Sequence, residues 1–141
     1  MKRSLLAALG VLAALGILAA QSQETFKTRL SPVPIDAQLA PTITGHGSVS
    51  AVLTGTKLTV TGMFEGMHSP ATVAHLHQSK MTGVPGAPIH ELTVSKAESG
   101  NVSGSVDLTP AETEALRKGL LYVVVHSEGA PDGNLWGWLL K

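Results

Sequence analysis

Six histidines are the side chains of this sequence best suited to chemistry, and two of them form a His-x-His pair. His75 and His77 flank Leu76 in a short run that is typical of a β-strand. On a strand, residues i and i+2 project from the same face about 6.5–7 Å apart, close enough for two imidazoles to converge on one ion. The pair therefore has the spacing of a metal chelate, although two ordinary, partly exposed strand histidines would show the same pattern.

A third histidine is placed to complete such a site. His126 ends the apolar run Tyr122–Val125, immediately before a loop rich in Gly, Pro and Asp. Three imidazoles with no carboxylate nearby in sequence favour copper or zinc over calcium or magnesium, with copper as the first choice and zinc as the second. His90 is a candidate fourth ligand, or a residue that supports a ligand; a surface histidine is the alternative. His46 and His68 lie in loops and are expected to be exposed.

Three methionines lie within twenty residues of the histidine pair. Thioethers favour Cu(I). Met63 is next to Phe64, which we expect to face inward, and it is predicted to fill the core. Met67 and Met81 stand among Gly and Ser residues and are candidate soft ligands near the metal.

Composition excludes several other classes of protein. The chain has no cysteine, a formal net charge of zero and 14% charged residues, which argues against a disulfide scaffold and a basic nucleic-acid binder. It contains no Gly-x-Ser-x-Gly elbow, phosphate-binding glycine loop or His-Glu-x-x-His helix, and its carboxylates are scattered. Trp136 and Trp138 are not surrounded by basic residues and are predicted to cap the core.

The first residues have the layout of a secretory signal peptide. Lys2 and Arg3 precede the uncharged run Leu5–Ala20, which is shorter than the roughly 20 residues of a membrane-spanning helix. We predict a signal peptide over residues 1–22, with cleavage after 20 or 22, and one exported domain over residues 23–141. An uncleaved anchor is the alternative. The expected location is the periplasm or the cell exterior, with no membrane span after cleavage.

The mature chain must position these histidines mainly with strands, because its apolar residues alternate in short runs bounded by Gly, Pro, Ser and Asn. A hairpin is predicted to turn at Gly55 and Thr56, and Thr109, Pro110 and Glu112 predict a capped helix over about 110–118. The other predicted strands are Val73–His77, Ile89–Val94, Val102–Leu108, Leu120–His126 and Leu135–Leu140, the last after a turn at Pro131–Asn134. The stretch Ser31–Thr44 is expected to form a strap or an edge strand.

Several sequence blocks together resemble a known family. They are Thr-Gly-Met-Phe-Glu-Gly-Met-His-Ser-Pro-Ala-Thr, Ala-His-Leu-His, Gly-Val-Pro-Gly-Ala-Pro, Leu-Thr-Pro-Ala-Glu, Gly-Leu-Leu-Tyr-Val-Val-Val-His and Pro-Asp-Gly-Asn-Leu-Trp-Gly. In order and spacing they resemble the CHRD domain, named from chordin and common in bacterial secreted proteins. The likeness covers roughly Glu24 to Lys141.

A second resemblance is to the copper/zinc superoxide dismutase fold, an antiparallel Greek-key β-sandwich or barrel. The family's His-x-His strand and late Val-Val-His strand match His75, His77 and His126, and His90 is placed to imitate its bridging histidine. The resemblance implies an all-β fold with a copper site. The family's zinc loop and disulfide have no counterpart here, so the site would be copper-only. The position of the arginine that attracts superoxide in that family is held by Trp136 in this sequence. Lys80 is the remaining candidate for that charge.

The sequence therefore predicts an exported copper-binding CHRD domain with three or four histidine ligands. Two uses stay open: redox chemistry on superoxide, as a copper-only dismutase-like oxidoreductase, and copper storage or delivery. The alternative is a secreted binding or structural module that recognises a protein or envelope partner, in which the histidines are incidental. No nucleic-acid partner is expected.

Overall fold

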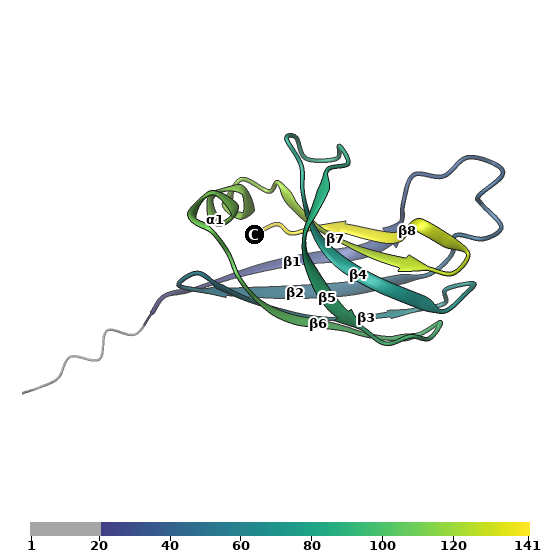
Figure 1. Cartoon of the computed structure of the whole chain (residues 1–141), viewed down its shortest axis with the longest axis horizontal. Helices are drawn as coiled ribbons and strands as arrows, with labels where there is room; N and C mark the ends of the chain where they lie inside the picture. The colour runs from purple at the N-terminus through teal and green to yellow at the C-terminus, as the bar shows by residue number, and fades with distance from the viewer. Residues whose placement is uncertain (1–20) are drawn as a thin grey trace, which may run out of the picture.

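Eight antiparallel strands close into a barrel in the computed structural model, which describes residues 21–141 (Figure 1). The strands are β1 (Gln23–Pro32), β2 (His46–Thr54), β3 (Lys57–Glu65), β4 (Ala71–Gln78), β5 (Ala87–Val94), β6 (Gly100–Asp107), β7 (Leu121–Ser127) and β8 (Ala130–Trp138), and the helix is α1 (Pro110–Arg117). Around the barrel the order is β1-β2-β3-β6-β5-β4-β7-β8. Since β3 pairs with β6 and β4 with β7, the connections are of the Greek-key kind. The predicted all-β fold with one short helix is confirmed.

Alternation of apolar and polar residues builds the interior of the barrel. In β2 and β3 the inward positions, which include Val49, Leu53 and Val60, are almost fully buried, and the chain turns between the two strands at Gly55 and Thr56 as predicted. Gly55 has a φ of +62°, which a glycine adopts without strain. The first 20 residues, which hold nearly all of the predicted signal peptide, lie outside the described residues.

The short helix closes one end of the barrel. The Thr109 side chain accepts a hydrogen bond from the backbone N–H of Glu112, and the Glu112 carboxylate accepts one from the backbone N–H of Thr109. This capping box starts the helix where the sequence predicted it. Leu116 is fully buried in the same core as the strands, so the helix is held by packing as well as by its cap.

Three predictions about the strands were wrong. The sequence interpretation missed β1, because its only buried apolar side chains are Phe26 and Leu30, separated by charged and polar residues. The last strand begins at Ala130 and not at Leu135, since Ser127 pairs with Ala130 across a tighter turn. Met63 is 62% exposed, because it alternates with the inward Phe64.

The outer face of β4, β7 and β8 is flanked by two long connections. The strap, residues 33–45 between β1 and β2, lies outside the barrel beside β8, and the β4–β5 loop projects from the same side (Figure 1). Within residues 21–141, no helix has the length and apolar character needed to cross a membrane.

Candidate metal centre

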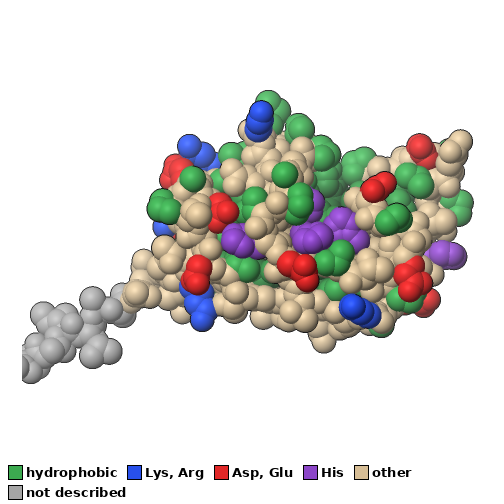
Figure 2. All heavy atoms as spheres, viewed as in Figure 1, with side chains coloured by type: hydrophobic (Ala, Val, Ile, Leu, Met, Phe, Trp, Pro, Cys, Tyr) green, Lys and Arg blue, Asp and Glu red, His purple; other side chains and the backbone are tan. Residues whose placement is uncertain are grey.

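Three histidines meet on the outer face of the barrel. In the antiparallel register His75 lies opposite Val124 and His77 opposite Tyr122, while His126 lies opposite Val73. Cross-strand partners point to the same side of a sheet, so all three imidazoles project outward from β4 and β7. One ring nitrogen from each lies within 4.8 Å of the others. Figure 2 shows a group of histidine side chains near the middle of the visible face, beside hydrophobic side chains.

Backbone carbonyls determine which nitrogen of two of these rings carries the proton. The Nδ1 atoms of His77 and His126 lie 2.9 Å from the carbonyl oxygens of Gly86 and Pro131, respectively. A carbonyl oxygen only accepts, so each Nδ1 donates and each neutral ring keeps its lone pair on Nε2. The Nε2 atom of His77 is buried and has no hydrogen-bond partner, and that of His126 lies 3.2 Å from Nδ1 of His75.

Because His126 Nε2 carries a lone pair, the Nδ1 atom of His75 donates to it in the metal-free protein. An ion placed between the rings would replace that proton, which would move to Nε2 of His75. The three nitrogens that face one another, and that could then bind one ion, are His75 Nδ1, His77 Nε2 and His126 Nε2. A hydrogen bond from the second ring nitrogen to a carbonyl is the usual way in which proteins orient a metal-binding histidine. The buried, unpartnered Nε2 of His77 costs free energy unless something binds it. The donor set therefore fits a metal ion that accepts three imidazoles.

Gly86 and Tyr122 hold His77 in this orientation. The backbone N–H of Gly86 donates to the Tyr122 hydroxyl at 2.7 Å, and that hydroxyl donates back to the Gly86 carbonyl at 3.0 Å. A Cβ at position 86 would overlap the carbonyl oxygen of Gln78, so only glycine fits there. The sequence analysis missed this support, although the Pro85-Gly86 pair eight to nine residues after His77 was a signal for a close turn.

The surroundings of His75 and His77 lower the pKa of both rings and so favour the neutral form, which is the form that binds metal. Burial lowers the pKa of His77, and the neighbouring His126 and His75 lower it further, against the opposing hydrogen bond to Gly86. Burial and His126 likewise lower the pKa of His75, while Glu91, opposite His75 on β5, acts in the other direction.

The structure places His90 apart from this group. Its cross-strand partner is Leu76, which faces the core, so His90 points to the opposite side of the sheet from His75 and His77. Its Nε2 atom lies 3.1 Å from the Glu112 carboxylate at the start of α1. The structure therefore does not bring His90 together with His75, His77 and His126, because a residue paired with the middle of His-x-His faces the other side of the sheet.

The methionines and tryptophans also differ from expectation. Met67 is buried in the barrel core and Met81 is 65% exposed on the β4–β5 loop, and neither belongs to the histidine group. Trp136 and Trp138 do not cap the core: they lie half-buried on the outer face of β8, where both rings contact Tyr122. The inward positions of that strand are taken by residues such as Leu135.

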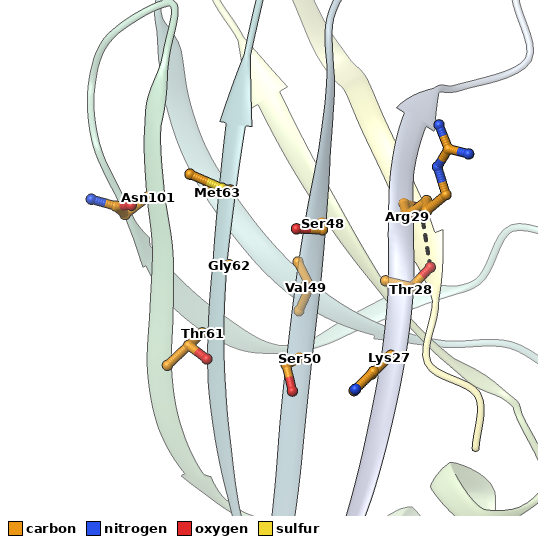
Figure 3. Close-up of a pocket in the computed structure, with 10 residues that line it drawn as sticks. All are labelled: Lys27, Thr28, Arg29, Ser48, Val49, Ser50, Thr61, Gly62, Met63 and Asn101. Carbon is orange, nitrogen blue, oxygen red and sulfur yellow. Dashed lines mark hydrogen bonds between the residues drawn. The ribbon is translucent and has the colours of Figure 1, made fainter.

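Two hollows lie on different faces of the barrel. A cavity of about 400 Å³ adjoins His77, Tyr122 and Trp136 on the side of the strap. A wider and more open hollow of about 660 Å³ crosses β1, β2, β3 and β6, where side chains such as Lys27, Ser48 and Thr61 stand along neighbouring strands (Figure 3). None of the described residues that line the wider hollow is a histidine, so the histidine group lies outside it.

Comparison with known proteins gave one match. Residues 26–139 match the CHRD domain family, and the chain belongs to that family. No curated protein and no solved structure matched the chain.

Proposed function

We propose that this member of the CHRD family binds copper through His75 Nδ1, His77 Nε2 and His126 Nε2. The observation that carries the proposal is the convergence of three ring nitrogens, two of which are left unprotonated because the other nitrogen of each ring donates to a carbonyl. These contacts orient the rings before any ion arrives. An ion at their centre would also satisfy the buried Nε2 of His77.

The donor set favours copper over its competitors. All three donors are imidazole nitrogens, and for such sites divalent affinity rises to Cu(II) and falls again at Zn(II). Zinc also accepts three histidines, so it is the ion that copper must outcompete. When bound, copper would supply one-electron chemistry, while the chain holds three ligands in place and leaves the histidine group partly open to solvent.

Storage or delivery of copper is the use that we favour over turnover of superoxide. An enzyme acting on superoxide gains from a positive charge that draws the anion in. Here the position of the expected arginine is held by Trp136, and within residues 21–141 no Lys or Arg lines the cavity beside His77. Lys80 lines a separate hollow on the β4–β5 loop. We also propose that the domain is exported, on the basis of the N-terminal sequence alone.

A competitive copper titration tests the proposal. The purified protein and the variant His126→Ala are titrated with Cu(II) against a competing chelator. Two control variants are His68→Ala, which changes an exposed histidine outside the group, and His90→Ala, which changes the histidine that the structure places apart from the other three. We expect one tight site per chain that is weakened at least about 100-fold in His126→Ala and unchanged in the two controls. Weak binding at several sites, or equal effects of all three variants, would overturn the proposal and favour a binding module with incidental histidines.

The same samples separate the two uses of copper. The copper-loaded protein is assayed for the disappearance of superoxide, with free Cu(II) at the same concentration as reference. Storage or delivery predicts a bound ion with little turnover, and transfer of that ion to an added chelator. Rapid turnover that is lost in His126→Ala would instead favour a dismutase.

A further inference from the structure

The cavity beside His77 has a lining unlike that expected for a small anion. Its walls are the outer faces of β7 and β8, including the start of β8 over residues 130–133, together with the strap and the loop around residues 85–86. Tyr122 and Trp136 supply aromatic surface, and Leu39 and Ile43 of the strap supply aliphatic surface. Among the described residues that line it, Asp132 is the one acidic side chain and there is no Lys or Arg, so this lining offers a carboxylate acceptor and no basic side chain.

Buried hydrogen bonds fix the strap that forms one wall. Asn134 is fully buried, and its backbone carbonyl accepts from the N–H of Val33 at 3.1 Å while its side-chain amide donates to the carbonyl of Thr44 at 2.8 Å. One side chain and its backbone thus hold both ends of the strap. The amide orientation is fixed in turn by the Ser127 hydroxyl, which donates to the Asn134 Oδ1 atom at 2.8 Å. The cavity is therefore built into the fold before a ligand arrives.

Apart from Nε2 of His77, which belongs to the proposed metal centre, the polar groups that the structure describes around the cavity are largely occupied. The carbonyl oxygens of Gly86 and Pro131 already accept from His77 and His126. The Tyr122 hydroxyl is engaged with both backbone groups of Gly86. A ligand would therefore meet an apolar and aromatic surface with one carboxylate among its walls.

We propose that this cavity binds a small uncharged aromatic molecule of the phenol class, with its ring against Tyr122 and Trp136 and its hydroxyl toward Asp132. A volume of about 400 Å³ is at the lower end of the range of small-molecule sites, which suits a single ring. Aromatic faces favour a stacked or edge-on ring. A phenolate or carboxylate would lose solvation and meet the Asp132 charge. The position next to a metal ion rests on the proposed function, whereas the cavity is a feature of the chain itself.

Binding of para-cresol to the metal-free protein is the direct test. The methyl NMR signals of Ile43, Val124 and Leu39 report on the cavity walls, and para-methylbenzoate serves as an anionic ligand of similar shape. We expect saturable shifts of these methyl signals with para-cresol, and binding at least about tenfold weaker for the benzoate. No saturable shift, or equal affinity for the two ligands, would overturn the proposal.

Two matched variants of the strap localise the binding. Leu39 lines the cavity and is 44% exposed, whereas Ile35 is 39% exposed in the same segment and does not line it. Leu39→Asp should weaken para-cresol binding about tenfold, and Ile35→Asp should leave it unchanged. Equal loss in the two variants would indicate a general effect on the strap and would contradict the assigned position.

The copper-loaded protein distinguishes failure of this proposal from failure of the metal centre. Saturable para-cresol binding in a protein that takes up no copper would support the cavity and refute the proposed function. Tight copper binding without any para-cresol binding would support the proposed metal centre and refute the proposed ligand of the cavity. If both proposals hold, para-cresol should change the electron paramagnetic resonance spectrum of bound Cu(II), because the ligand lies against the His77 side of the site.

Discussion

Replacing Tyr122 by phenylalanine tests how the histidine group is held in place. The change removes only a hydroxyl, which lies 2.7 Å from the Gly86 nitrogen and 3.0 Å from the Gly86 oxygen. The half-buried Gly86 N–H would lose its acceptor, at a cost of about 0.5–1.5 kcal/mol in the free energy of unfolding. The Gly86 carbonyl, which orients His77, would also lose its support.

The expected result is a combined loss of stability and of copper affinity. Removing a group that orients a ligand weakens metal binding about 10–100-fold, which corresponds to about 1.4–2.7 kcal/mol. Urea unfolding of the metal-free protein measures the first quantity, and a Cu(II) titration against a chelator measures the second.

A control outside the histidine group separates orientation from general destabilisation. Thr109→Ala removes the helix cap and should lower the free energy of unfolding by about 0.5–2 kcal/mol, and Thr109 contacts none of the three histidines of the metal centre. Its copper affinity should equal that of the unchanged protein. If Tyr122→Phe keeps full copper affinity, or if Thr109→Ala loses as much, the reasoning about Gly86 and His77 is refuted.

Three further predictions concern pH and packing. Because the folded pKa values of His75 and His77 lie below 6.5, the unfolded chain binds more protons, so metal-free stability should fall as the pH drops below about 6.5. Urea unfolding at several pH values measures this fall in stability. If stability falls as steeply in His77→Gln as in the unchanged protein, the attribution of the fall to His77 is contradicted. Glu24 has a pKa of about 2 because of its two ion pairs, so Glu24→Gln should lower the melting temperature at pH 7, and the difference should vanish as the pH falls from about 4.5 to 2. A Cβ at Gly137 would approach the Thr28 hydroxyl oxygen to 2.5 Å where β1 meets β8. Gly137→Ala should therefore lower the free energy of unfolding in urea by about 1–3 kcal/mol. Unchanged stability would refute that contact.

The interior of the barrel followed directly from the sequence where strands alternate strictly. The β2–β3 hairpin is one example, with its turn at Gly55 and Thr56. The helix is another, because Thr109 and Glu112 form a local capping box. Such patterns depend on residues close together in the chain, and they determine local structure without knowledge of the rest.

Features that depend on distant contacts could not be predicted in this way. β1 has too few apolar residues to be recognised, and it is fixed by pairing with β2 and β8. The face on which His90 lies depends on its register opposite Leu76. Asn134 was placed in a turn, yet it is a buried strand residue that holds the strap, since the register of β8 decides which way it points.

The nitrogen that each histidine offers to the ion is the most direct test of the proposed centre. Long-range proton–nitrogen NMR correlations of the imidazoles, recorded on the protein with and without Cu(I), identify the coordinating atom of each ring. The contacts to Gly86 and Pro131 predict coordination by Nε2 of His77 and Nε2 of His126, together with Nδ1 of His75. Unchanged signals for these three rings, or coordination through Nδ1 of His77 or His126, would contradict the account.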